Sequence, residues 1–150
     1  MAYRLRPATN DDLVTLGELK LRASLAWGDH IQELQAMPEA RIVPAEHLPF
    51  IFIVEDADRI VGFATVLPGS EGRADLEDLF VDPECWGLGI GRLLAHEAER
   101  RAEALGASAL DVVAGRAGDF YKACGFEVVG AAQTELEPVL LMTLRLGRSA

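Results

Sequence analysis

The sequence predicts an α+β fold in a single domain that spans residues 1–150. Half of the residues are hydrophobic and a quarter are charged, which is the balance of a globular protein. Within residues 50–81, apolar runs rich in β-branched and aromatic residues follow one another without a helical pattern between them. Segments with helical spacing flank this region. Strands and helices therefore do not alternate strictly, as they would in a doubly wound α/β fold.

The N-terminal region begins with a short strand and a capped helix. YRLRPAT alternates and then breaks at Pro7, which predicts a strand over about Tyr3–Arg6. In TNDD, at residues 9–12, Thr or Asn supplies an N-cap and the two Asp lie in the first turn, where the helix dipole favours negative charge. Residues 28–48 show little pattern beyond a candidate short helix in IQELQAM. The expected buried stripe of the first helix is Leu13, Leu16, Leu19 and Ala23.

The central region predicts a hairpin, a third strand and a long helix. FIFIVE (50–55) and RIVGFATVL (59–67) are joined by the turn DAD, which favours an antiparallel pair. ADLEDLFV (74–81) is the third strand and stops before an Asp-Pro pair. GRLLAHEAERRAEALG then has the spacing of an amphipathic helix, and Gly106 is placed to end it.

The C-terminal region predicts a strand, a short helix and two more strands. These are SALDVVA (108–114), RAGDFYKACG (116–125), FEVVG (126–130) and EPVLLMTLRL (137–146). The whole chain thus contains about seven strands and about four helices.

Charge and composition exclude several classes of function. The net charge of −10 would repel a nucleic-acid backbone and attract a cationic substrate such as an amine. Cys85 and Cys124 do not lie at metal-ligand spacing with any of the three histidines, so we expect no metal site. No apolar run approaches the roughly 18 residues of a membrane span, and the first ten residues lack a signal-peptide core. We expect a cytoplasmic protein with no membrane partner.

The stretch WGLGIG, with Gly87, Gly89 and Gly91, indicates an anion-binding turn. A glycine-rich turn that leads into a helix presents backbone N–H groups to a phosphate at the positive end of the helix dipole. The spacing is GxGxG, which is neither the GxxxxGK[ST] of a P-loop nor the GxGxxG of a dinucleotide fold. The glycines alone leave open a plain strand-to-helix turn.

Two motifs together resemble the GNAT superfamily of N-acetyltransferases, which use acetyl-CoA. VDPECWGLGIGRLL (81–94) is similar to its central motif, a V-x-P strand end followed by Q/R-x-x-G-x-G/A. AGRAGDFYKACGF (114–126) is similar to a second signature, N-x-x-A-x-x-F-Y-x-x-x-G-F. Two positions depart from the pattern: Trp86 replaces Gln or Arg, and Ala114 replaces Asn. The resemblance extends from YRLRPAT to MTLRL.

The resemblance implies a GNAT fold and a binding mode for the cosubstrate acetyl-CoA. The fold is a mixed, mostly antiparallel central sheet flanked by helices. The strands ADLEDLFV and SALDVVA splay apart, and the pantetheine arm pairs with exposed backbone in that opening. The implied pantetheine contacts are the backbone groups of Leu79, Phe80 and Val81. The implied pyrophosphate contacts are Gly87, Leu88, Gly89, Ile90, Gly91 and Arg92, although Arg92 equally fits a solvated helix position.

The same resemblance assigns catalytic roles. A neutral amine attacks the thioester, so a proton must be removed, an oxyanion stabilised and a thiolate protonated. The implied hydrogen-bond donor to the oxyanion is the Val81 N–H. The implied general acid is Tyr121. The alternative for Tyr121 is that its ring only packs against the short helix. A strand carboxylate acting through water is the implied base, with Glu77 the first choice and Asp75 the second. Glu77 and Asp75 are equally compatible with a solvent-exposed structural role, or with binding a cationic amine by its charge.

The sequence therefore predicts an N-acetyltransferase that moves an acetyl group from acetyl-CoA to a primary amine by direct transfer in a ternary complex. The alternative is a non-catalytic acyl-CoA-binding or regulatory module that has kept the cofactor turn. Small amines, amino acids, aminoglycosides, polyamines and peptide amines all stay open as acceptors. The resemblance also leaves a homodimer open.

Overall fold

The computed structural model describes residues 3–147. The chain forms two compact units, each assembled from two separate segments. Unit 1 comprises Met1–Thr65 and Asp78–Leu94, and unit 2 comprises Val66–Glu77 and Ala95–Ala150. The prediction of one domain over residues 1–150 stays a prediction.

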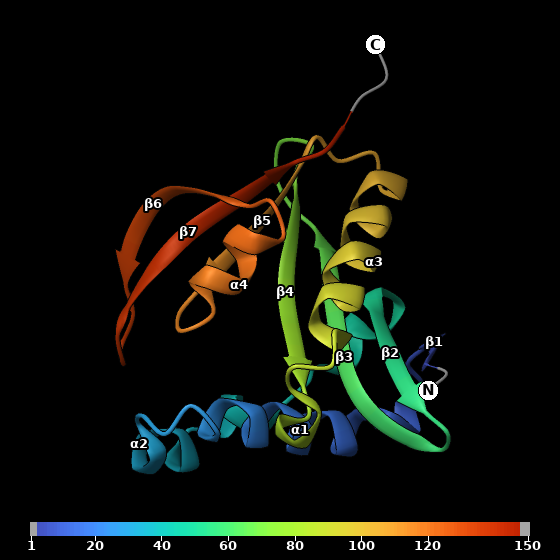
Figure 1. Cartoon of the computed structure of the whole chain (residues 1–150), viewed down its shortest axis with the longest axis vertical. Coiled ribbons are helices and arrows are strands. Elements are labelled where there is room, and N and C mark those ends of the chain that lie inside the picture. Colours follow the sequence, from blue (N-terminus) through green and yellow to red (C-terminus); the bar gives the residue numbers. More distant parts are fainter. Residues whose placement is uncertain (1–2, 148–150) are drawn as a thin grey trace. The chain divides into compact units, whose positions relative to one another are not determined.

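Within residues 3–147 the chain has seven strands, four α-helices and four short 3-10 segments (Figure 1). The strands are β1 (Tyr3–Pro7), β2 (Ile51–Asp56), β3 (Arg59–Pro68), β4 (Ala74–Val81), β5 (Ala109–Ala114), β6 (Glu127–Gln133) and β7 (Pro138–Arg145). The α-helices are α1 (Leu13–Leu25), α2 (Ile31–Ala36), α3 (Ile90–Ala104) and α4 (Gly118–Ala123). The 3-10 segments are η1 (Asn10–Asp12), η2 (Pro38–Arg41), η3 (Ala45–Phe50) and η4 (Pro83–Cys85). The strand order is β1-β2-β3-β4-β5-β7-β6, with β4 and β5 parallel, which confirms the predicted α+β class with a mixed sheet.

Unit 1 begins as an antiparallel meander. β1 pairs with β2 from Tyr3 opposite Asp56 to Pro7 opposite Phe52. β2 and β3 then form the predicted hairpin, whose register shifts at a bulge between Val54 and Glu55. The hairpin turn places Ala57 at a φ of 57°, a left-handed conformation that suits a tight reversal.

The core of unit 1 lies between α1 and the inner face of β2 and β3. Leu16 and Leu19 of α1 are buried together with Val43, Ile51, Ile53 and Phe63. Three of the four residues predicted to line this helix are buried, while Leu13 is only half-buried. A Cβ on Gly17 would lie 2.1 Å from the carbonyl oxygen of Arg41, so the small residue is what lets η2 approach the helix.

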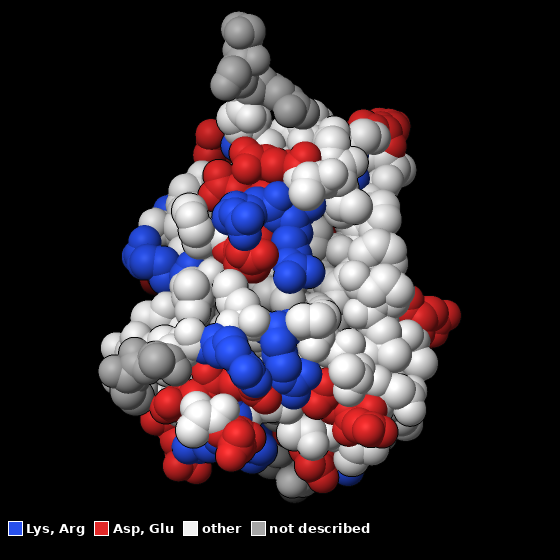
Figure 2. Space-filling model, turned by 90° about the vertical axis from the view of Figure 1, so that its right-hand side faces the viewer, with Lys and Arg blue, Asp and Glu red and all other residues white. Residues whose placement is uncertain are grey.

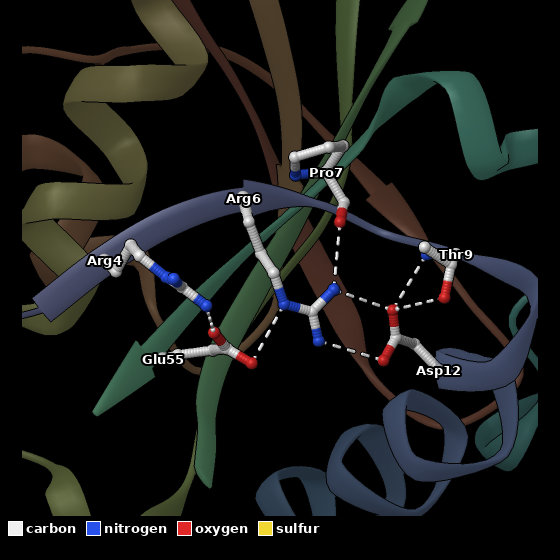
Figure 3. Close-up of polar contacts among 6 residues, drawn as sticks. All are labelled: Arg4, Arg6, Pro7, Thr9, Asp12 and Glu55. Carbon is white, nitrogen blue, oxygen red and sulfur yellow. Dashed lines mark hydrogen bonds and ion pairs between the residues drawn. The ribbon is translucent and has the colours of Figure 1, made fainter. Parts of the chain in front are cut away.

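The start of α1 is tied to the meander by Arg6 (Figure 3). The Arg6 guanidinium contacts both Asp12 oxygens, at 2.9 and 3.0 Å, and one Glu55 oxygen at 2.9 Å. Thr9 and Asp12 form a capping box at η1, so the helical run starts as a 3-10 turn and not directly as α1. The hydrogen bond from Arg6, together with its charge and the bonds from Thr9, outweighs burial and lowers the pKa of Asp12 to about 2.

Unit 2 is built around β5, β7 and β6, with α4 beside them (Figure 1). β5 pairs antiparallel with β7 from Ala109 opposite Arg145 to Ala114 opposite Leu140. β6 pairs with the other edge of β7 and has a bulge between Val128 and Gly130. The two strands predicted after α4 are confirmed, and they pair with each other.

The surface carries both signs of charge. On the face drawn in Figure 2, Lys and Arg side chains lie beside Asp and Glu side chains, so the acidic excess does not make this face uniformly negative. None of the helices within residues 3–147 has the length and apolar character needed to cross a membrane.

Candidate cofactor site and catalytic residues

The segment that follows β4 is held by its own backbone and by Asp82. The Asp82 N–H donates to the carbonyl of Val61 in β3 at 2.8 Å. Its carboxylate accepts the N–H of Glu84 at 3.0 Å, which caps the short η4 turn. The chain therefore leaves β4 in a defined direction before it reaches the glycines.

Asp82 is also the acceptor of two arginines. Its Oδ2 receives hydrogen bonds from Arg22 of α1 at 2.9 Å and from Arg59 of β3 at 2.7 Å, and the residue is only 3% exposed. Burial alone would raise the pKa of Asp82, but the hydrogen bonds from Arg59 and Glu84 and the charges of both arginines outweigh it, so the pKa lies below its usual range. The ionised carboxylate of Asp82 therefore connects α1 and β3 with the segment that leads into the glycine turn.

The glycine turn has the backbone conformation that an anion site needs. Gly87 and Gly89 have φ angles of +83° and +89°, and the space where a Cβ would stand is open at both. The glycines are therefore required by backbone conformation and not by packing. The first α-helical hydrogen bond runs from the Leu93 N–H to the carbonyl of Gly89 at 3.0 Å. The N–H groups of residues 90–92 consequently have no acceptor within the helix.

The first turn of α3 is pressed against β3. A Cβ on Gly62 would lie 3.0 Å from Leu94, 3.1 Å from the carbonyl oxygen of Phe80 and 3.2 Å from Ile90. Ile90 and Leu94 are 1% and 0% exposed. Core packing thus fixes the start of the helix, and with it the N–H groups that have no acceptor within the helix.

Trp86 supports the turn from the other side. Its indole Nε1–H donates to the carbonyl of Val81 at 2.9 Å, and its ring centroid lies 5.2 Å from that of Trp27. The sequence marks Trp86 only as a departure from the family pattern. In the structure this side chain ties the turn to the last residue of β4.

All nine residues predicted to bind the cofactor lie in unit 1. Phe80 packs its ring 5.8 Å from that of Phe63, so its side chain belongs to the core and its contribution to a ligand is limited to backbone. Leu88 is 51% exposed at the tip of the turn, and Arg92 is exposed on α3. The nine are Leu79, Phe80, Val81, Gly87, Leu88, Gly89, Ile90, Gly91 and Arg92.

The three predicted catalytic residues lie in unit 2. Tyr121 on α4 is 6% exposed, and its ring meets those of Phe120 and Phe126 edge to face at 5.1 and 5.3 Å. Gly125 ends the helix at a φ of +99°, and the Phe126 N–H bonds the Tyr121 carbonyl at 3.0 Å. The conformation of the FYKACGF motif therefore holds this phenol ring between two aromatic neighbours.

The carboxylates of β4 divide between two environments. Asp75 and Glu77 are exposed, while Leu76 and Asp78 are 4% and 6% exposed, as strand alternation predicts. The sequence predicts Glu77 and Asp75, and not Asp78, as the base. The signal was present, because an Asp between Leu76 and Phe80 on an inner face is unusual.

β4 and β5 pair over a short stretch within unit 2. Among the described residues of this unit, two pairs join the strands: Ala74 with Leu110 and Asp75 with Asp111. Arg73 clamps this end with hydrogen bonds of 2.8 and 2.6 Å to Asp111, which lower the pKa of Asp111. β5 continues along β7 to Ala114.

Comparison with known proteins agrees with this arrangement. The acetyltransferase (GNAT) family model matches residues 18–126, more than half of the chain. No curated protein matches the sequence.

Three solved structures illustrate the fold. The GCN5-related N-acetyltransferase from Rhodopseudomonas palustris is 24% identical, with a TM-score of 0.80 and 97% of both chains covered. YncA from Salmonella typhimurium, solved with its cofactor acetyl-CoA, is 18% identical, with a TM-score of 0.71 over 100% of this chain and 97% of the other. N-acetylglutamate synthase from Neisseria gonorrhoeae, solved with coenzyme A and N-acetyl-glutamate, is 20% identical with a TM-score of 0.76; 99% of this chain is covered, but only 36% of the synthase. At these identities the likeness concerns the fold, and the family model decides membership: the chain belongs to the acetyltransferase (GNAT) family.

Proposed function

We propose that this protein is an acetyl-CoA-dependent N-acetyltransferase that transfers the acetyl group directly to a primary amine in a ternary complex. The observation that carries the proposal is the turn from Trp86 to Arg92, with two left-handed glycines and a row of N–H groups without helical acceptors. The acetyl-CoA bound to the Salmonella relative and the coenzyme A bound to the Neisseria synthase support it.

The proposed cofactor contacts are mainly backbone groups. The N–H groups of residues 87–92 would bind the pyrophosphate at the positive end of α3, and the backbone of residues 79–81 would pair with pantetheine. Arg92, exposed in the first turn of α3, adds a positive charge. The polar atom of Trp86 donates to the Val81 carbonyl within the protein. The proposed binding of the pyrophosphate therefore relies on backbone N–H groups and not on the side chain at position 86.

The proposed chemistry needs three groups. A neutral amine attacks the thioester carbonyl, the tetrahedral oxyanion forms, and its collapse breaks the C–S bond. In this proposal the Val81 N–H donates to the oxyanion and Tyr121 gives its proton to the departing thiolate. Glu77, or Asp75 in its place, takes the amine proton through water. The exposure of both carboxylates is compatible with a water-mediated step.

Two measurements test the proposal in sequence. Acetyl-CoA should raise the melting temperature at micromolar concentrations, whereas NAD at the same concentration should not. Thiol release from acetyl-CoA is then followed with a panel of alkyl amines, amino acids, polyamines, aminoglycosides and peptides. Stabilisation without thiol release from any amine would favour the acyl-CoA-binding module, and no stabilisation at all would refute both.

The acceptor and the assembly belong to the same proposal. N-acetyl-glutamate in the Neisseria complex makes amino acids one class for the panel. A homodimer would be detected by sedimentation of the purified chain, with and without acetyl-CoA.

A further inference from the structure

The two tryptophans of the chain lie next to each other beside the proposed cofactor turn. Trp27 follows α1 and Trp86 precedes the glycines, and their ring centroids are 5.2 Å apart. Both residues belong to unit 1. They are 42% and 40% exposed, which leaves a large aromatic area in water at one place. The family pattern gives this pair no role, because it has Gln or Arg at position 86. A half-exposed aromatic pair beside a ligand turn is a candidate contact surface for that ligand.

Contacts within unit 1 hold both rings in place. Trp86 Nε1–H donates to the Val81 carbonyl at 2.9 Å. The end of α1, which leads into Trp27, is tied to the same segment by the hydrogen bond from Arg22 to Asp82 at 2.9 Å. Each ring then packs against the other. The pair is therefore a preorganised surface, which loses little conformational freedom when a ligand covers it.

The hydrogen bond from Trp86 places its indole at one particular edge of β4. The Asp82 N–H donates to the Val61 carbonyl of β3 at 2.8 Å. In a trans peptide the N–H and the C=O point in opposite directions, and the described residues contain no cis peptide bond. The Val81 carbonyl therefore points away from β3, and the Trp86 indole N–H meets it on that side. The proposed function needs the same edge for pantetheine, because β3 occupies the other edge at this point.

The exposed surface of the pair suits the uncharged arm of acetyl-CoA better than its phosphates. The Trp86 N–H is already used within the protein, so this ring offers carbon surface to a ligand. A pyrophosphate needs N–H donors, which the turn at residues 87–92 supplies in the proposed function. Pantetheine is uncharged, and its end next to the pyrophosphate carries a gem-dimethyl group. Methyl groups gain free energy when they leave water and pack on an aromatic ring.

We propose that Trp27 and Trp86 bind the gem-dimethyl end of the pantetheine arm with their exposed ring surfaces. This inference rests on the proposed function and adds an apolar contact to the backbone contacts named there. The order of the groups agrees along the chain and along the cofactor. The pyrophosphate lies at residues 87–92, the dimethyl group at the aromatic pair, and the thioester further along β4. The affinity for acetyl-CoA therefore has a part that does not depend on its phosphates.

The first test compares two ligands in Trp27→Leu, which removes one ring and keeps an apolar side chain. Acetyl-CoA contains pantetheine, whereas adenosine 3′-phosphate 5′-diphosphate has the pyrophosphate without it. We expect the Kd of acetyl-CoA to rise about fivefold or more, and the Kd of the nucleotide to change less than about twofold. Trp27→Phe, which keeps a ring, should bind both ligands like the wild type. Ile42→Ala, which removes an exposed apolar side chain of unit 1 outside the pair, should also change neither Kd.

The second test uses the wild type and its tryptophan fluorescence. Because the chain has two tryptophans and both lie in the pair, this emission reports on the proposed surface alone. S-acetylpantetheine, which has no phosphate, should shift or quench the emission in a saturable way. No change with S-acetylpantetheine would overturn the inference. A saturable change with an alkyl amine of the panel, in the absence of acetyl-CoA, would assign the rings to the acceptor and overturn it as well.

The outcomes separate the inference from the proposed function. If Trp27→Leu loses affinity for both ligands equally, the ring only supports the turn and the inference is wrong. An unchanged Kd for acetyl-CoA in this variant also refutes it. If the wild type does not bind acetyl-CoA, the proposed function fails and the inference falls with it. If it binds acetyl-CoA but acetylates no amine, the transfer reaction fails while the pantetheine contact stands. Should Trp27→Leu not fold, Trp27→Met gives the same comparison.

Discussion

The indole Nε1–H of Trp86 donates to the backbone carbonyl of Val81 at 2.9 Å, which joins the residue before the glycine turn to the last residue of β4. The hydrogen bond spans the η4 turn, where Asp82 is already held by Arg22 and Arg59. The strand end and the glycine turn are therefore held twice, once by an aromatic side chain and once by the two ion pairs of the buried Asp82 carboxylate. Such bracing preorganises backbone N–H groups for a ligand.

Replacing Trp86 with Phe should weaken acetyl-CoA binding. The variant keeps an aromatic ring beside Trp27 but loses the donor to Val81, so the turn becomes less well ordered. A hydrogen bond of this kind contributes about 0.5–1.5 kcal/mol, which corresponds to an increase in Kd of roughly 2- to 10-fold. Titration calorimetry with acetyl-CoA measures it. Trp27→Phe, which leaves the hydrogen bond intact, is the control, and equal Kd values for Trp86→Phe and wild type would refute the role.

Gly89→Ala should impair cofactor binding more than stability. A φ of +89° costs an alanine about 1 kcal/mol, and the new Cβ projects into the open space where the proposed pyrophosphate lies. We expect acetyl-CoA affinity to fall by about fivefold or more. Gly28→Ala is the matched control, since Gly28 has a φ of +84°, similarly open surroundings and no place in the turn. The prediction fails if both variants bind acetyl-CoA equally.

Tyr121→Phe should lower kcat while the fold stays intact. The variant retains the ring contacts with Phe120 and Phe126. Loss of a proton donor reduces kcat by about 100-fold, with little effect on the KM for acetyl-CoA. Tyr3→Phe removes the other tyrosine hydroxyl of the chain and serves as the control. If Tyr121→Phe turns over at the wild-type rate, another group protonates the thiolate and Tyr121 is not the general acid.

Asp12→Asn should reduce stability in a pH-dependent way. Arg6 holds the pKa of Asp12 at about 2, below the ordinary 3.8, so the pair stabilises the folded state fully above about pH 4. The contribution is lost as the pH falls from about 4 to about 2, because the carboxylate is then protonated in the folded state as well. Denaturant unfolding should show a loss of roughly 1–2 kcal/mol at pH 7 and a much smaller loss near pH 2.

Asp11→Asn is the control for this measurement, because it removes the same charge from the exposed neighbouring position. A difference between Asp12→Asn and wild type that stays equal at both pH values would contradict the assignment.

Most elements could be predicted because their signals are local. The β4 strand has the predicted bounds, 74–81, since alternation and the following Asp-Pro pair are both visible in the sequence. The helix predicted from GRLLAHEAERRAEALG forms as α3, Ile90–Ala104. Of its predicted apolar face, Leu94, Ala98 and Ala102 are buried, but Leu105 is 46% exposed. The secondary structure of residues 28–48 could not be predicted from such local signals. They form α2, η2 and η3, short segments that are stabilised by packing and carry little pattern of their own.

By itself the sequence determined the order of strands and helices, the glycine turn and the family resemblance, because each depends on residues close together in the chain. Only the tertiary structure decided which charges are paired. Arg22 lies 60 residues before Asp82, Arg59 lies 23 before it, and Thr65 lies 13 before Asp78. No local pattern indicates such partners, because they meet only when the sheet and α1 pack together. Within the described residues 3–147, the same packing gives Asp78 the Thr65 hydroxyl as its partner and no cation.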